Sequence, residues 1–209
     1  MTSEPHAITE LVLIRHAQTE SLNQGLIHGQ TDSPLSQDGI LAARKTASYF
    51  RGQVFHGLYA SSLGRAMHTA AIIGEAINRQ PVGVDGLREQ YYGWLEGKPG
   101  RWFNPECNGK WILRPLVRLA MKTTAEPEAD YFHRVTRSAD EIIAAHTGQR
   151  IILVVHWGIL CILVRYLKQE PLDGCLSPRR WTACGISELH QNSHGWQAVR
   201  LNDDSHLKI

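Results

Sequence analysis

The chain has 209 residues, of which 43% are hydrophobic and 20% are charged, and its formal net charge is +2. A chain of this length and composition can bury a large core, so we expect one globular domain over residues 1–209. The near-neutral charge argues against nucleic acid as a partner, because binding to a phosphate backbone needs a strongly basic surface.

Three features of the sequence bear on the cellular compartment of the protein. The first ten residues, "MTSEPHAITE", contain no apolar stretch of the kind that directs export, and the four cysteines show no CxxC spacing. The most apolar segment, "IILVVHWGILCILV", is too short to span a bilayer and is interrupted by His-Trp-Gly. These features predict a cytoplasmic protein with no membrane association.

The first part of the chain predicts two strand–helix pairs. Leu11–Ile14 is a short apolar run, which is typical of a strand buried on both faces. Residues 34–50 then predict an amphipathic helix with Ser36 as its N-cap. The next strand is expected at residues 57–61, and the next helix at Leu63–Asn78.

The second part continues the alternation. A helix is expected at Asp130–His146, a buried strand at Ile151–Val155 and a helix at Trp157–Leu167. Residues 185–203 predict two strands joined by a short turn at Asn192–Gly195. Repeated strand–helix units predict an α/β fold, a three-layer α/β/α sandwich with a mostly parallel central sheet.

Charged side chains follow two of the expected strands. Arg15 and His16 come directly after the first apolar run, and His156 follows the run at Ile151–Val155. In open parallel sheets the ligand crevice lies beyond the carboxyl ends of the strands. We therefore expect these side chains to face one crevice.

Six motifs resemble, in order, those of the histidine phosphatase superfamily, also called the phosphoglycerate mutase-like family. They are "RHAQTESLN", "DSPLSQDG", "SSLGRAMHTA", "LREQYYGWLEG", "VVHWG" and "LNDDSHL". The resemblance covers nearly the whole chain and implies a phosphoglycerate mutase-like fold. The catalytic residues that it implies are His16, Glu89, His156, Arg15 and Arg65.

These residue types fit phosphoryl transfer. By the resemblance, His16 is the nucleophile and becomes a phosphohistidine, and Glu89 is the general acid that protonates the leaving group. A neutral imidazole approaches a phosphate anion without charge repulsion. Arg15 and Arg65 can hold the phosphoryl oxygens with planar, permanently charged groups, and His156 adds a third contact. Because the arginines neutralise the phosphate, no metal or cofactor is expected.

Further residues are implied at the substrate side. Thr19 and Asn23 match positions that contact the phosphate, although each could simply shape its loop. Tyr92 either lines the substrate pocket or packs in the core. Glu126 matches a glutamate near the pocket of many phosphatases. Trp157, where the family has glycine, either stacks on the substrate or fills a packing gap.

The remaining histidines show no ligand spacing such as HExxH and are interpreted as surface or loop residues. They are His28, His68, His133, His194 and His206. His28 stands where the family usually has glutamine, so it could alter the pocket wall.

An irregular insertion, rich in Trp, Pro and Gly, is expected on the substrate side at about residues 97–128. Its basic residues recur at every fourth position and are Lys110, Arg114, Arg118 and Lys122. They form either a positively charged lid that attracts an anionic substrate or an ordinary solvated helix face.

The resemblance implies a metal-independent phosphomonoester hydrolase that acts on a small phosphorylated metabolite. One alternative is a phosphoglycerate mutase, which would use the same residues but return the phosphoryl group to the product. The other is an inactive phosphate-binding regulatory protein, which is disfavoured because the histidine and both arginines are kept. The terminal strands could offer an edge for a homodimer.

Overall fold

The computed structural model describes residues 8–100, 119, 123–172 and 181–208. Its strands are β1 (Thr9–Arg15), β2 (Gly57–Ser61), β3 (Val82–Val84), β4 (Arg150–Val155), β5 (Ile186–Asn192) and β6 (Gly195–Asp203). Its helices are α1 (Glu20–Asn23), α2 (Gln37–Phe50), α3 (Gly64–Ile77), α5 (Glu128–Ala145) and α6 (Trp157–Leu167), with 3₁₀ turns η1 (Asp85–Leu87), η2 (Gly93–Leu95) and η6 (Ser205–Leu207). The basic residues predicted to form a stripe in the insertion, Lys110, Arg114, Arg118 and Lys122, lie outside the described residues.

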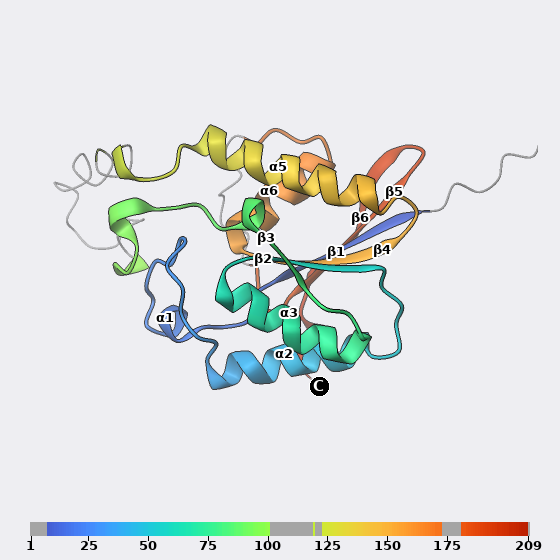
Figure 1. The fold of residues 1–209 in the computed structure, drawn as a ribbon, viewed down its shortest axis with the longest axis horizontal. Coiled ribbons are helices and arrows are strands. Elements are labelled where there is room, and N and C mark those ends of the chain that lie inside the picture. The colour runs from blue at the N-terminus through green and yellow to red at the C-terminus, as the bar shows by residue number, and fades with distance from the viewer. Residues whose placement is uncertain (1–7, 101–118, 120–122, 173–180, 209) are drawn as a thin grey trace, which may run out of the picture.

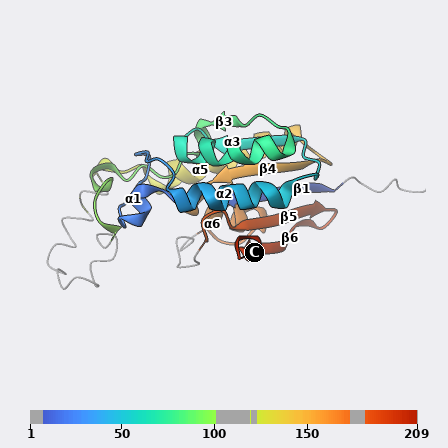
Figure 2. The same ribbon diagram turned by 90° about the horizontal axis from the view of Figure 1, so that it is seen from below.

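The six described strands form one sheet in the order β3-β2-β4-β1-β5-β6. The pairs β3–β2, β2–β4 and β4–β1 are parallel, whereas β5 is antiparallel to both β1 and β6. Figure 2 shows the β5–β6 hairpin along one edge. The predicted mostly parallel sheet and the terminal strand pair are both confirmed.

Helices cover both faces of the sheet. In Figure 1, α5 and α6 lie above it and α2 and α3 lie below. Alternate residues of β1 point to opposite faces, so Leu11 and Leu13 join the core under α5 and α6, while Val12 and Ile14 join the core over α2 and α3. All four side chains are fully buried, and each such burial contributes about 1.5–3 kcal/mol. The continuous apolar run is thereby explained, and the three-layer sandwich is confirmed.

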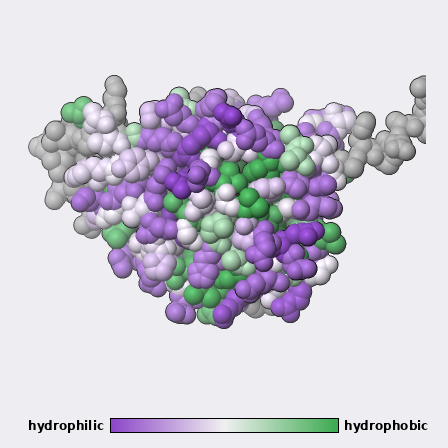
Figure 3. All heavy atoms as spheres, viewed as in Figure 1, coloured by the Kyte–Doolittle hydropathy of each residue, from purple (hydrophilic) through white to green (hydrophobic). Residues whose placement is uncertain are grey.

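Local signals explain where the helices begin and how they pack. The Ser36 hydroxyl accepts a hydrogen bond from the Gly39 N–H at 3.1 Å and caps α2, as predicted. In α5 the buried residues Tyr131, Val135, Ala139 and Ile142 repeat at helical spacing. The outer surface over α5 is hydrophilic in Figure 3. Among the described helices, none is long and apolar enough to cross a membrane.

The structure corrects one interpretation from the sequence and adds short elements. His206, interpreted as a surface or loop residue, is only 5% exposed, because η6 packs against α2. Its Nε2 lies 3.0 Å from the Thr46 hydroxyl, while its Nδ1 is buried without a partner among the described residues. The short elements α1 and β3 were not predicted, since runs of four and three residues carry too little periodicity.

Candidate active site

The parallel pairing of β1 with β4 brings His16 and His156 together. Arg15 is in register with Val155, and the His16 N–H donates to the Val155 carbonyl at 2.8 Å. The next residue of each strand is therefore a histidine at the same end of the sheet. The two ring centroids lie 5.1 Å apart, with the ring planes tilted by 60°, and both side chains are buried.

Hydrogen bonding determines which nitrogen of His16 carries the proton. Its Nδ1 lies 2.8 Å from the carbonyl oxygen of Ala17. A carbonyl only accepts hydrogen bonds, so Nδ1 must be the protonated atom. The neutral ring then keeps a free lone pair on Nε2, which is the form that a nucleophile requires.

The second histidine is oriented by Ser61, at the end of β2. The Ser61 hydroxyl lies 2.7 Å from His156 Nε2 and also accepts a hydrogen bond from the Leu63 N–H. Among the described residues the hydroxyl has no other acceptor for its own proton, so it donates to Nε2. This places the ring proton of His156 on Nδ1, which is buried and has no partner among the described residues.

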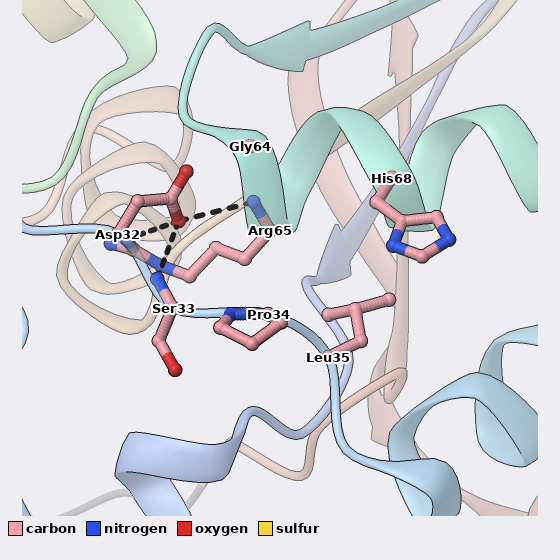
Figure 4. A pocket seen from close by; sticks show the side chains of 7 residues that line it. All are labelled: Asp32, Ser33, Pro34, Leu35, Gly64, Arg65 and His68. Carbon is pink, nitrogen blue, oxygen red and sulfur yellow. Dashed lines mark hydrogen bonds and ion pairs between the residues drawn. The ribbon is translucent and has the colours of Figure 1, made fainter.

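Arg65 begins α3 and is held rigidly by the loop before α2. Its guanidinium donates to the Gly29 and Thr31 carbonyls at 2.7 and 3.0 Å and pairs with Asp32 at 3.3 Å. Asp32 also accepts the Arg65 backbone N–H at the start of the helix. Figure 4 shows this pair beside a pocket of about 370 Å³, with His68 one turn further along α3. Within the described chain, Arg65 Nε is buried and unbonded.

Arg15 supplies a second, partly buried cation. One of its terminal nitrogens donates to the Trp181 carbonyl at 2.6 Å, while its Nε has no hydrogen-bond partner in the described residues. The two arginines and His156 therefore each hold a buried N–H that no described group accepts. Most buried polar atoms in proteins have a hydrogen-bond partner, so three unpartnered nitrogens on neighbouring residues need an explanation.

Burial and positive charge keep both histidines neutral. The pKa of His16 lies well below its usual value of 6.5, first because the ring is desolvated and then because Arg65 and Arg15 are close. The pKa of His156 is lowered well below 6.5 by burial and then by Arg65. Burial and the nearby guanidinium groups thus keep both histidines neutral at physiological pH.

Glu89 is buried against α5 and the start of α6 rather than paired with Arg88 on the surface. Its Oε1 accepts from the Tyr131 hydroxyl at 2.5 Å and from the Gln90 N–H at 3.0 Å. Its Oε2 accepts from the Gly158 N–H at 3.0 Å. A Cβ atom at Gly158 would come within 2.5 Å of Glu89 Oε1, so glycine is required for this close approach.

Glu126 forms an ion pair with a residue that the sequence analysis did not single out. Arg134 donates through Nε and Nη2 to the two Glu126 oxygens at 2.6 and 2.7 Å. It also donates to the carbonyls of Gly86, Arg88 and Glu89. In this structure the Glu126 carboxylate therefore binds Arg134 and, through it, the loop that carries Glu89.

The predicted phosphate contacts Thr19 and Asn23 have partners within the protein. The Thr19 hydroxyl caps α1 by accepting the Leu22 N–H at 3.3 Å, and it also lies 3.3 Å from His28 Nε2. Asn23 is exposed, and its side-chain oxygen accepts from Gln18 at 3.0 Å. Their roles in phosphate binding stay predictions.

Two aromatic residues, Tyr92 and Trp157, pack against apolar clusters. Tyr92 contacts the small cluster of Ile27 and Leu95, and Trp157 packs on the core beneath α5 and α6. Packing was one of the two alternatives for each. A role in substrate binding stays a prediction for both.

Sequence reasoning missed Ser61, Tyr131 and Arg134. Each acts on a catalytic candidate from a different part of the chain, and only the fold shows these contacts. For Ser61, the position at the end of an expected strand was an available signal, since strand ends line the crevice. His28, expected on the surface or in a loop, lies in a loop but is partly buried beside Thr19.

Comparisons with known proteins agree with this geometry. The model of the histidine phosphatase superfamily (branch 1) matches residues 11–204. A metal-independent phosphoserine phosphatase of Arabidopsis thaliana is 27% identical over 205 residues, which cover 96% of this chain and 84% of that protein. The structure of the alpha-ribazole phosphatase from Shigella flexneri matches with a TM-score of 0.78 at 25% identity, covering 93% of this chain and 96% of that one.

A third match concerns the fold alone. The structure of a phosphoglycerate mutase from Bacillus anthracis matches with a TM-score of 0.79 at 21% identity, over 98% of this chain and 97% of that one. The phosphoglycerate mutase-like fold expected from the sequence is confirmed.

Proposed function

Since the chain belongs to the histidine phosphatase superfamily, we propose that it is a metal-independent phosphomonoester hydrolase. Its substrate is a small phosphorylated metabolite, and its reaction proceeds through a phosphohistidine at His16. The family match over residues 11–204 also supports a single catalytic domain.

One observation carries the proposal. Three buried nitrogen donors without partners in the described chain, Arg15 Nε, Arg65 Nε and His156 Nδ1, belong to residues close to His16, whose Nε2 holds a lone pair. A phosphoryl group has oxygens to accept those donors and a phosphorus atom for the lone pair to attack. Two guanidinium charges offset the charge of a phosphomonoester, which is the task a metal ion performs in other phosphatases.

The first half of the reaction transfers the phosphoryl group to the protein. The Nε2 lone pair of His16 forms a bond to phosphorus as the ester P–O bond breaks. The electron pair of that bond stays on the leaving oxygen, which takes a proton from the Glu89 carboxyl group. Arg15, Arg65 and His156 hold the three remaining phosphoryl oxygens during the transfer.

The second half restores the protein. A water molecule attacks phosphorus, and the Glu89 carboxylate accepts its proton. The P–N bond breaks, its electron pair returns to His16 Nε2, and inorganic phosphate leaves. The reaction is hydrolysis if water is the acceptor, and mutase chemistry if a hydroxyl of the product is the acceptor. The phosphatases of Arabidopsis thaliana and Shigella flexneri support hydrolysis, whereas a probable phosphoglycerate mutase of Yersinia pestis, 29% identical over 207 residues, supports the mutase alternative.

The test is phosphate release from a panel of phosphorylated metabolites, including O-phosphoserine and 3-phosphoglycerate, with and without a metal chelator. We expect at least one substrate to release phosphate at a rate that the chelator does not change. Rapid quenching in base should trap an acid-labile phosphoryl group on the wild-type protein but not on His16→Ala. His194→Ala is the matched control, because His194 is exposed in the turn at the opposite end of the sheet.

Three results would contradict the proposal. Turnover by His16→Ala would mean another nucleophile. Isomerisation of 3-phosphoglycerate without phosphate release would establish the mutase alternative. Phosphate binding without any turnover would indicate a binding protein.

A further inference from the structure

Tyr131 makes a contact that the proposed reaction does not by itself explain. It lies in α5, is fully buried, and donates its hydroxyl to Glu89 Oε1 at 2.5 Å. Arg134, one turn along α5, places its guanidinium carbon 4.9 Å from the centre of the tyrosine ring. The phenol is thus fixed from two sides.

The hydrogen bonds of Glu89 are divided unequally between its two oxygens. Oε1 accepts two, from the Tyr131 hydroxyl and the Gln90 N–H, whereas Oε2 accepts only one, from the Gly158 N–H. A carboxylate oxygen offers two lone pairs in its plane. Oε1 is therefore filled, and Oε2 retains one lone pair for a proton.

We propose that Tyr131 is a positioning residue that occupies Oε1 of Glu89 and so confines the transferable proton to Oε2. The inference rests on the proposed function, in which Glu89 is the general acid. In the first step the proton leaves Oε2 for the ester oxygen, and Glu89 becomes a carboxylate with all three hydrogen bonds kept. In the second step the proton of the attacking water returns to Oε2.

Tyrosine suits this role because its hydroxyl stays protonated throughout the cycle. Burial, and then the negative charge of Glu89, raise the pKa of Tyr131 well above its usual value of 10. The phenol is a permanent donor and does not compete as a proton source. The geometry also depends on Gly158, since a Cβ there would come within 2.5 Å of Glu89 Oε1 and 2.6 Å of Tyr131 Oη.

The decisive variant is Tyr131→Phe, which removes one oxygen atom and opens Oε1 to the proton. We expect kcat/KM for an alkyl phosphate, whose leaving group needs protonation, to fall about tenfold, and kcat/KM for p-nitrophenyl phosphate to change less than threefold. Tyr166→Phe is the matched control, because the Tyr166 hydroxyl donates to the Asp140 carboxylate at 2.6 Å across the exposed side of α6 and α5. It should change neither value.

A double-mutant cycle separates positioning from a general loss of structure. If Tyr131 acts through Glu89, Tyr131→Phe should not change the preference between the two substrates further in a Glu89→Gln background. Two results would overturn the inference. One is an equal fall in kcat/KM for both substrates in Tyr131→Phe. The other is that Tyr131→Phe changes the ratio between the two substrates as much in the Glu89→Gln background as in the wild-type protein. If the wild-type protein hydrolyses neither ester, the proposed function fails; if it hydrolyses both and Tyr131→Phe leaves their ratio unchanged, only this inference fails.

Discussion

Arg134 and Glu126 form a bidentate ion pair in which the guanidinium reaches beyond its partner to the loop that carries Glu89. All five N–H groups of Arg134 have acceptors, namely the two Glu126 oxygens and the carbonyls of Gly86, Arg88 and Glu89. Glu126 also accepts the Tyr91 N–H at 3.3 Å. The pair therefore ties α5 to the loop that carries Glu89.

We expect Arg134→Lys to misplace that loop although it preserves the charge. Lysine has three donors and no planar fork, so at least two of the five bonds are lost. The free energy of unfolding should fall by about 2–3 kcal/mol. This loss is near the lower end of the range for breaking a buried ion pair, because the pair is only partly buried. Chemical denaturation measures this, and kcat for alkyl phosphates should fall with it. Arg137→Lys, in the exposed Arg137–Glu141 pair of the same helix, should change stability by less than about 0.5 kcal/mol; a similar loss there would refute the specific role.

Glu89→Gln tests the acid directly. The amide cannot donate the acid proton, so kcat/KM for alkyl phosphates should fall about 100-fold or more. Hydrolysis of p-nitrophenyl phosphate should slow far less, because p-nitrophenolate leaves without protonation. Steady-state kinetics on the two esters check this, and equal slowing of both would remove Glu89 from the acid role.

Ser61→Ala should allow the ring proton of His156 to occupy either nitrogen. Without the hydroxyl at 2.7 Å, the ring proton is no longer confined to Nδ1, which faces no acceptor among the described residues. We expect inorganic phosphate to bind about tenfold more weakly, since a charge-assisted hydrogen bond contributes about 1.5–3 kcal/mol. Product inhibition gives that constant, and Ser193→Ala, in the exposed turn between β5 and β6, is the control. Unchanged inhibition would show that Ser61 does not set the tautomer.

Because the pKa values of three histidines are lowered in the folded protein, its stability should fall in acid. His16, His28 and His156 all have pKa values below 6.5 in the folded protein, and burial lowers the pKa of His28 to about 4. The unfolded chain then binds more protons below pH 6.5, so this stability is present above pH 6.5 and is lost as the pH falls.

The corresponding measurement is denaturation in phosphate-free buffers from pH 7.5 to pH 4. His28→Asn should show a shallower loss of stability between pH 6.5 and about 4 than the wild-type protein. His194→Asn should follow the wild type, because that ring is exposed in a turn. Identical slopes for His28→Asn and the wild type would mean that His28 titrates normally in the fold.

The sequence predicts the parts of the fold that follow strong local patterns. The expected segments 57–61 and 157–167 coincide with β2 and α6, because an apolar run and an apolar helix face are local properties. The extent of α5 was predicted less well, since it begins at Glu128 instead of Asp130. Helix ends depend on capping, and no side chain caps α5.

For the candidate site, motifs point to residues but not to their contacts. Arg15, His16 and His156 could be grouped because parallel strands end at one edge. The donors Tyr131 and Gly158 could not be grouped with Glu89, since they lie on two helices that are far from Glu89 in the sequence. Glu126 was placed near the pocket by resemblance, whereas its ion pair with Arg134 depends on the packing of α5.

The two ends of the sheet carry different groups of side chains. Toward the end opposite His16, an ion-pair network joins Glu10 and Arg150 to Glu188 and Arg200 of the β5–β6 hairpin. Because this end is a full strand length away from the histidines, a reporter peptide or fluorophore inserted at Ser193–His194 should leave the chemistry untouched. The hairpin is thus a natural attachment point for following phosphate capture in single molecules.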